Sequence, residues 1–154
     1  MRIRHATTAD LAWLVRVSAR ISEEPPPFGD PRLLPADPNL CGELWRHAVA
    51  DHLVLIAVND HGENVGLVFG WRSYHPFNPA LRTLTSALWY VLAEHRKGRA
   101  GLMLMDAFTE WGNKHVDFIS FTVRTPGAIS ALERRGFGSP EATLVRWSAN
   151  QNQP

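Results

Sequence analysis

The strongest constraint on the fold is one strand–turn–helix passage in the middle of the chain. The segment 82–94, RTLTSALWYVLAE, is rich in β-branched and aromatic residues, which favour a long strand. The segment 101–114, GLMLMDAFTEWGNK, places Leu104, Phe108 and Trp111 on one stripe of a helix. A strand that runs through a short turn into an amphipathic helix, with another strand after it, predicts a right-handed parallel crossover and an α/β fold.

The flanking segments complete a predicted order of β-α-α-β-β-β-α-β-α-β, a mixed central sheet with helices on both faces. The predicted elements are a strand at 2–7, helices at 9–23 and 41–51, strands at 52–60, 64–74 and 82–94, a helix at 101–114, a strand at 116–123, a helix at 126–136 and a strand at 141–149. Thr7 or Thr8 can cap the first helix. Pro126 suits the first turn of the last helix, and Gly136 suits its C-terminal end.

Prolines interrupt the pattern twice. The stretch 24–39 holds most of them and predicts a long, irregular connection of the kind that often lies beside a substrate. The stretch 75–81, HPFNPAL, predicts a second loop.

Composition narrows the class of protein. The chain of 154 residues has 45% hydrophobic and 20% charged residues, which describes one globular domain, here 1–149, with a tail at 150–154. Its net charge of +1 argues against a general polyanion binder. A single cysteine, Cys41, excludes an internal disulfide and a cysteine-rich zinc site. No signal peptide or membrane-spanning run is evident, so we expect a cytoplasmic protein.

The turn between the central strand and helix concentrates positive charge and small residues. Its basic or imidazole side chains are His95, Arg96, Lys97 and Arg99. The start of a helix presents unpaired N–H groups and a positive dipole end, and Gly98, Ala100 and Gly101 would let a phosphate approach the backbone. The alternative is a solvated turn whose cations keep the surface soluble. Neither of the two common glycine-rich phosphate loops is present.

At this passage the chain resembles the GNAT family of acetyl-CoA-dependent N-acetyltransferases. That family has a strand ending in valine, followed about five residues later by R/Q-x-x-G-x-G/A at the start of a helix. Val91 ends the strand here, and Arg96, Arg99 and Gly101 occupy the three fixed positions. Arg99 departs from the pattern because glycine is usual there. A second register, His95-x-x-Gly98-x-Ala100, also fits loosely.

Two further stretches share the resemblance. GAISALERRGF, residues 127–137, is similar to the late helix of the family, which ends in Gly-Phe as Gly136 and Phe137 do. The run EHRKGRAGLMLM, residues 94–105, is similar to small GNAT proteins encoded by bacteriophages.

The resemblance implies acetyl-CoA as co-substrate and a role for each matching position. The backbone of Tyr90, Val91 and Leu92 would hydrogen-bond the pantetheine where the strand splays from its neighbour. The pyrophosphate would lie against a run of main chain formed by Arg96, Lys97, Gly98, Arg99, Ala100, Gly101 and Leu102. Thr125 stands near the cofactor, where the family commonly has asparagine.

The catalytic positions of the family are less well matched. Leu132 replaces a tyrosine that often acts as the acid, and Thr85 replaces a glutamate of histone-type members. Tyr90, Glu94 and His75 are the substitute candidates. Each has a plainer interpretation: Tyr90 as a packing residue, Glu94 as a surface carboxylate and His75 as a loop residue.

Three classes of function follow. The first is an N-acetyltransferase that uses acetyl-CoA and a primary amine, as a monomer or homodimer. The second is a catalytically degenerate module that binds coenzyme A or serves a structural role. A nucleic-acid binder is third, because one short basic patch supplies few phosphate contacts. The remaining histidines show no metal-binding spacing, so no metal is expected.

Overall fold

The computed structural model describes residues 1–25, 37–123 and 126–138. Within them, one five-stranded sheet has the order β1-β2-β3-β4-β5. The strands are β1 (Arg2–His5), β2 (Leu53–Val58), β3 (Asn64–His75), β4 (Asn78–Val91) and β5 (Phe118–Phe121). The helices are α1 (Leu11–Glu23), α2 (Pro38–Asp51), α3 (Ala100–His115) and α4 (Pro126–Glu133), with single 3-10 turns at η1 (Thr8–Asp10) and η2 (Ala93–His95).

The sheet is mixed, as the sequence predicts. Strands β1 to β4 pair antiparallel, and β4 pairs parallel with β5 after the crossover through α3. The strand predicted at 141–149 lies outside the described residues. Of the two helices before the central hairpin, α2 begins at Pro38, inside the stretch predicted as loop, because Asp37 caps it by accepting a hydrogen bond of 2.8 Å from the amide of Asn39.

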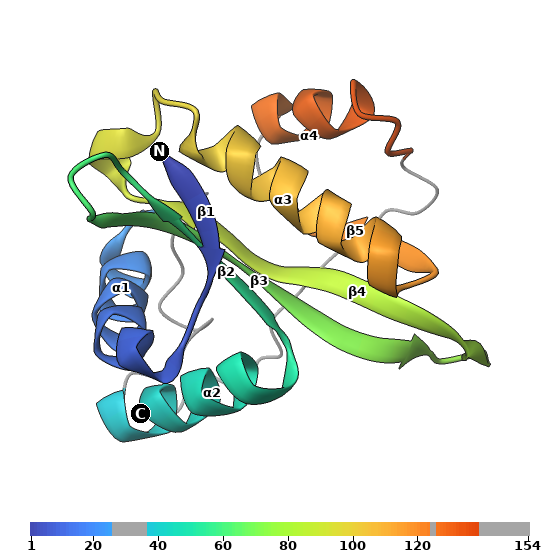
Figure 1. Ribbon diagram of the computed structural model, residues 1–154, viewed down its shortest axis with the longest axis horizontal. Coiled ribbons are helices and arrows are strands. Elements are labelled where there is room, and N and C mark those ends of the chain that lie inside the picture. Colours follow the sequence, from blue (N-terminus) through green and yellow to red (C-terminus); the bar gives the residue numbers. More distant parts are fainter. Residues whose placement is uncertain (26–36, 124–125, 139–154) are drawn as a thin grey trace.

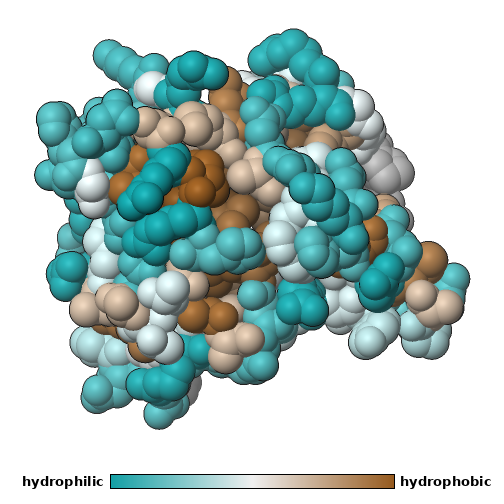
Figure 2. Space-filling model, viewed as in Figure 1, coloured by the Kyte–Doolittle hydropathy of each residue, from teal (hydrophilic) through white to brown (hydrophobic). Residues whose placement is uncertain are grey.

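Helices cover both faces of the sheet (Figure 1). Helices α1 and α2 pack on one face, where the Trp45 indole donates a hydrogen bond of 2.8 Å to Ser18. Helix α3 packs on the other face through Leu104 and Phe108, and α4 lies beside α3. Strand β2 is buried along its whole length, as its run of aliphatic residues requires between two helical layers. Figure 2 shows hydrophilic residues around the rim of one face and hydrophobic surface nearer its centre.

The start of α1 is fixed by a local ion pair. Thr7 is the N-cap of η1, and its amide donates to the carboxylate of Asp10 at 2.9 Å. Arg4 on β1 donates two hydrogen bonds of 2.7 Å to the same carboxylate. The guanidinium of Arg4 lowers the pKa of Asp10 to about 2. Of the two predicted caps, Thr7 is the N-cap of η1, whereas α1 itself has Asp10 as its N-cap and begins two residues later than the predicted residue 9.

The hairpin of β3 and β4 is longer than predicted. The segment 75–81 was expected as a loop, but β3 runs to His75 and β4 begins at Asn78. This expectation was wrong because Pro79 falls in a register shift between the pairs His75–Asn78 and Tyr74–Arg82, where proline is tolerated, and this part of β4 pairs with β3 alone. The two strands therefore extend beyond the helices as a ribbon (Figure 1).

The end of α4 follows the sequence closely. The helix begins at Pro126, and Gly136 adopts a left-handed φ of 83° after its last turn. The Phe137 amide then donates to the Leu132 carbonyl at 3.2 Å, and the Phe137 ring packs edge-on against Phe121 at 5.4 Å. The predicted Gly-Phe ending thus ties α4 to β5.

Candidate functional site

An opening separates β4 from β5 beyond a short stretch of pairing. Their ladder runs from Thr83–Phe118 to Ser86–Phe121, and β4 continues to Val91. A bulge lies at the same level, because Phe69 pairs with Leu88 whereas the next residue of β3 pairs with Ser86. One extra residue of β4 bends the strand away from β5 there. The opening predicted beside Val91 is confirmed.

The alternation of the β4 backbone decides which groups face this opening. The Leu92 amide donates to the Val65 carbonyl of β3 at 3.0 Å. Because backbone groups alternate along a strand, the amides of Trp89 and Val91 turn to the other side, toward the opening. Tyr90 and Leu92, both predicted to hydrogen-bond a ligand through the backbone, instead turn their amides toward β3.

A cavity of about 640 Å³ occupies the opening. Its volume falls within the range of small-molecule sites. Its walls come from five regions of the fold: the end of β4, the basic turn, the start of α3, the segment from β5 into α4, and the face formed by α1, α2 and β3. The described lining residues are Ile21, Leu44, Trp45, Phe69, Trp71, Ala87, Leu88, Trp89, Tyr90, Val91, Arg96, Gly98, Gly101, Leu102, Thr122, Val123, Gly127, Ala128 and Ala131.

The start of α3 forms one end of this cavity. Arg99 is the N-cap of the helix, and its carbonyl accepts the first helical hydrogen bond, from Met103 at 3.0 Å. The amides of Ala100, Gly101 and Leu102 belong to the first turn, where helical amides have no partner within the helix. The amides of Arg96 and Gly98 instead donate within the turn, to Ala93 and His95. The sequence predicted that the amides of residues 96–102 bind a phosphate. In the structure, only those in the first turn of α3 are suited to bind an anion.

The turn does not need the glycine that Arg99 replaces. Arg99 has φ −89° and ψ −5°, an ordinary right-handed conformation. In the described part of the chain, every residue with a positive φ is a glycine outside this turn. The departure from the family pattern therefore costs no backbone strain.

Arg96 lies against the cavity in a specific arrangement. Its Nε donates to the Val91 carbonyl at 2.9 Å, and its guanidinium lies 5.2 Å from the centre of the Tyr90 ring. Its Nη2 donates to Oε2 of Glu24 at 2.5 Å. The side chain thus joins the end of β4 to the end of α1.

Tyr90 completes this group of three side chains. Its hydroxyl donates to Oε1 of Glu24 at 2.5 Å. Burial, followed by the hydrogen bond to Glu24, raises the pKa of Tyr90 to about 12. Near neutral pH, Tyr90 is therefore a hydrogen-bond donor and not a base. A phenol of this pKa is also a weaker acid than a thiol, with an ordinary pKa of about 8.5, so it protonates a departing thiolate poorly.

The other predicted residues lie at varying distances from the cavity. Leu92 and Ala100 are buried beside it, and Lys97 and Arg99 lie in the turn, but none of the four lines it. Glu94 is exposed and pairs with Arg20 at 3.2 Å; its pKa is lowered by its own backbone amide and then by Arg20.

His75 lies at the far end of the hairpin, where its Nδ1 accepts from the Phe77 amide at 3.3 Å. It is four residues beyond the cavity-lining Trp71, which is about 13 Å along a strand. The structure therefore does not bring His75 to the cavity. Thr125 lies outside the described residues.

The two replaced catalytic positions have structural roles. Leu132 is 5% exposed and packs with Met105 of α3. The Thr85 hydroxyl accepts a hydrogen bond of 2.9 Å from Ser120 and so links β4 to β5 below the opening. Neither side chain lines the cavity.

Glu24 and the aromatic wall of the cavity, formed by Trp45, Phe69 and Trp71, were not predicted from the sequence. Glu24 is the C-cap of α1 and the first residue of the proline-rich stretch 24–39, where nothing in the local pattern distinguishes it from its neighbours. Its partners are more than 60 residues away in the chain. In the sequence, the three aromatic residues look like ordinary core residues, and Trp45 is indeed buried in the core.

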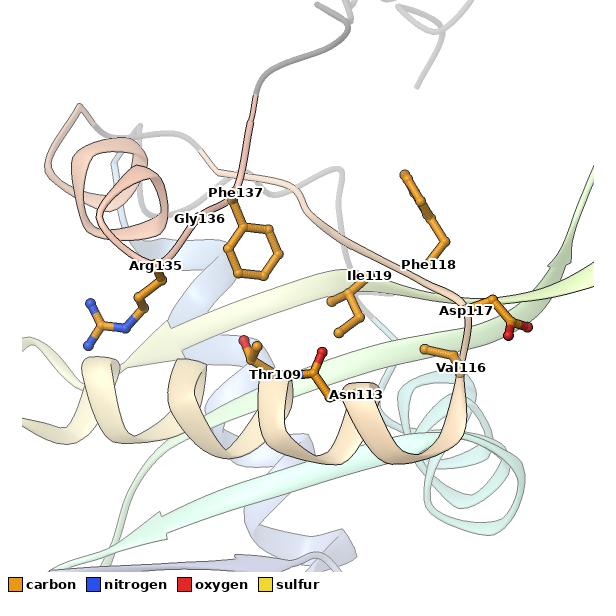
Figure 3. A pocket seen from close by; sticks show the side chains of 9 residues that line it. All are labelled: Thr109, Asn113, Val116, Asp117, Phe118, Ile119, Arg135, Gly136 and Phe137. Carbon is orange, nitrogen blue, oxygen red and sulfur yellow. The ribbon is translucent and has the colours of Figure 1, made fainter.

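A smaller groove of about 310 Å³ lies between α3, β5 and the end of α4 (Figure 3). Thr109, Ile119, Arg135 and Phe137 are among its described lining residues. It shares none of these with the larger cavity, and no predicted site residue lies in it.

Across the described ranges, no three histidine, cysteine or acidic side chains gather closely enough to hold a metal ion. None of the helices in that part of the chain is long and apolar enough to cross a membrane.

Comparison with known proteins identifies the fold. The sequence matches no protein-family model and no curated protein. Solved structures do match. An acetyltransferase from Trypanosoma brucei is 13% identical with a TM-score of 0.72, covering 96% of this chain and 99% of its own. A predicted acetyltransferase from Clostridium acetobutylicum, solved with acetyl-CoA, is 13% identical with a TM-score of 0.72 over 99% of both chains.

A transcriptional regulator from Bacillus halodurans also shares the fold, at 18% identity and a TM-score of 0.72 over 96% of this chain and 99% of its own. The chain therefore has the α/β fold of acetyltransferases, in agreement with the resemblance to the GNAT family. The similarity to bacteriophage proteins stays a prediction.

Proposed function

We propose that this protein is an N-acetyltransferase that transfers the acetyl group of acetyl-CoA to a primary amine. The observation that carries the proposal is the cavity between β4 and β5, which is continuous with the first turn of α3. Such an opening exposes strand amides and helix-end amides together, and a ligand with both amide and phosphate groups satisfies both sets.

The described residues fit coenzyme A in this position. The pyrophosphate would accept from the amides of the first turn of α3, with Lys97 and Arg99 adding positive charge. Gly101 leaves the approach open, although packing does not require a glycine there, since a Cβ would make only ordinary contacts of 3.7 Å with Trp89 and Val91. The pantetheine would pass along the amides of Trp89 and Val91. The structure solved with acetyl-CoA is a neighbour in fold and supports this choice of ligand.

The chemistry would rest mainly on positioning. The amide of Val91 can polarise the thioester carbonyl, and the bend of β4 holds that amide in place. Binding the amine beside the thioester makes the attack effectively intramolecular. Leu132 cannot act as an acid, so we expect the departing thiolate to be protonated through water.

The second candidate is a module that binds coenzyme A without catalysis. The burial of Leu132 and the engagement of Thr85 favour it, because both would be catalytic positions in relatives of the family.

Two measurements test the proposal. Calorimetry should show binding of acetyl-CoA, with desulfo-coenzyme A as a control that retains the pyrophosphate. Release of free thiol should then depend on an added primary amine. Absence of acetyl-CoA binding would reject both candidates, whereas binding without thiol release from any amine would establish the non-catalytic module.

A further inference from the structure

We propose, building on the function above, that Glu24 is the catalytic base, and that it binds the ammonium group of an acceptor with a flat, apolar body. Glu24 lies at the end of α1 with its side chain 18% exposed, and both of its oxygens are engaged by groups that line the cavity. Tyr90 holds one oxygen and Arg96 holds the other.

The carboxylate keeps capacity for a further donor. Two carboxylate oxygens offer about four acceptor positions, and Tyr90 and Arg96 each fill one. An ammonium group brings three donors and can approach the remaining positions. The two existing partners fix the orientation of the carboxylate, which lowers the cost of binding the amine.

The charges around the cavity favour such a residue. Among the described lining residues, Arg96 is the one that carries a full charge. A cationic acceptor would be repelled by Arg96 in this partly enclosed space unless a carboxylate stood beside it. Glu24 neutralises Arg96 and supplies that carboxylate at the same point.

The rest of the cavity favours an apolar acceptor. Toward α1, α2 and β3, the described wall consists of Ile21, Leu44, Trp45, Phe69, Trp71 and Leu88. Trp71 is partly exposed, and its ring stacks on His52 at 4.1 Å between centroids, which holds it in place. A flat apolar group could lie against Trp71, whereas a polyamine or a charged peptide would find no partner among these side chains.

The proposed step starts from the ammonium form of the acceptor. The ammonium gives one proton to Glu24, and the resulting amine nitrogen attacks the carbonyl carbon of the thioester. A C–N bond forms and the C–S bond breaks, with its electron pair leaving on sulfur. The nitrogen loses a second proton through water to the thiolate. The products are the acetamide and coenzyme A, and Glu24 returns its proton to solvent.

Phenethylamine is a suitable probe, with phenethyl alcohol as its uncharged counterpart. We expect wild-type protein to use phenethylamine at least tenfold better, in kcat/KM, than ethylamine or putrescine, because the ring buries against the cavity wall. Glu24→Gln should lower kcat/KM for phenethylamine by about a hundredfold or more while acetyl-CoA affinity stays within about twofold. Trp71→Ala should reduce the preference for phenethylamine over ethylamine.

Glu110→Gln is the matched control, since it makes the same substitution at an exposed glutamate that pairs with Lys114 in α3 and leaves Glu24 intact. It should change neither kcat/KM for phenethylamine, nor acetyl-CoA affinity, nor the preference over ethylamine by more than about twofold. Binding provides a readout that does not need turnover: in the presence of coenzyme A, Glu24→Gln should weaken phenethylamine but not phenethyl alcohol. A purely structural role for Glu24 would weaken both.

Three results would overturn the inference. The first is Glu24→Gln activity within about threefold of wild type. The second is equal weakening of the amine and the alcohol. The third is a preference for putrescine or for a peptide amine over phenethylamine. Thiol release with polar amines alone would support an acetyltransferase but contradict this inference. Absence of acetyl-CoA binding would contradict the proposed function itself.

Discussion

The hydroxyl of Tyr90 on β4 donates a 2.5 Å hydrogen bond to Glu24, which lies 66 residues earlier at the end of α1. Glu24 favours the protonated form of the phenol, so its removal should lower the pKa of Tyr90 from about 12 toward the ordinary value of 10.0. The measurement is an alkaline titration of tyrosinate absorbance. It should use a Tyr74→Phe background, because the chain has two tyrosines and this leaves Tyr90 alone.

In that background, Glu24→Gln should titrate at a lower pH than its parent, yet above 10.0 because burial persists. Since the folded-state pKa is raised, the stability that Tyr90 contributes is present below pH 10 and lost as the pH rises through about 12. Circular dichroism should confirm that the fold is intact at each point. Identical midpoints in both proteins would show that the hydrogen bond does not form in solution.

Acid should weaken the junction of β1 and α1. The pKa of Asp10 is lowered from 3.8 to about 2, chiefly by the hydrogen bonds from Arg4. The difference corresponds to roughly 2 kcal/mol of the free energy of unfolding, present above pH 3.8 and lost as the pH falls through about 2. Urea unfolding should show Asp10→Asn to be less stable by about this amount at neutral pH.

The two proteins should approach each other in stability near pH 2, where about half of the wild-type carboxylate is protonated. Asp60→Asn is the comparison, because Asp60 is exposed and pairs with the N-terminus. It should have a much smaller effect. A constant difference between wild type and Asp10→Asn from neutral pH down to pH 2 would contradict the assignment.

Gly70 should tolerate no side chain. A Cβ there would lie 2.4 Å from Cε2 of Phe108 and 2.7 Å from Cδ1 of Leu84. We expect Gly70→Ala to lower the free energy of unfolding by about 1–3 kcal/mol through overpacking. Gly42→Ala is the control, because Gly42 is inside α2 and a Cβ there has its nearest neighbour at 3.9 Å. It should be neutral or stabilising by up to about 1 kcal/mol, and equal effects of the two changes would refute the packing argument.

The positive charges at the start of α3 should matter for acetyl-CoA and not for folding. Replacing Lys97 and Arg99 with alanine should weaken binding about tenfold at low salt, and the difference should shrink as salt is added. Lys114→Ala controls for net charge, since Lys114 lies in the last turn of the same helix. Calorimetry at two ionic strengths makes the comparison. Unchanged acetyl-CoA affinity in the double variant would show that Lys97 and Arg99 do not contribute to binding.

Most of the fold could be predicted from local patterns in the sequence. Strand β4, the basic turn and α3 were predictable because alternation, charge and small residues are all local signals. Gly136 and Pro126 marked the ends of α4 for the same reason. The length of the β3–β4 hairpin was not predictable, since Pro79 signals a loop in sequence although a register shift between the two strands accepts it.

The candidate site was predictable only where it is continuous in the chain. The turn from Arg96 to Leu102 was found as one motif. The direction of the Arg96 side chain, toward Val91 and Glu24, depends on where α1 ends in space, and no local pattern encodes that. The opening was expected from a resemblance, whereas its cause, the bulge at Ala87, is a matter of register between two strands.

The amides of Trp89 and Val91 face the opening beside β4, and this bears on how such chains diverge. An amide at the end of a strand or helix is supplied by almost any amino acid, so long as the conformation is kept. Arg99 illustrates this, since it takes the place of a glycine with an ordinary φ of −89°. Chains 13% identical can therefore share the fold at a TM-score of 0.72. The fold can therefore persist where few side chains are shared.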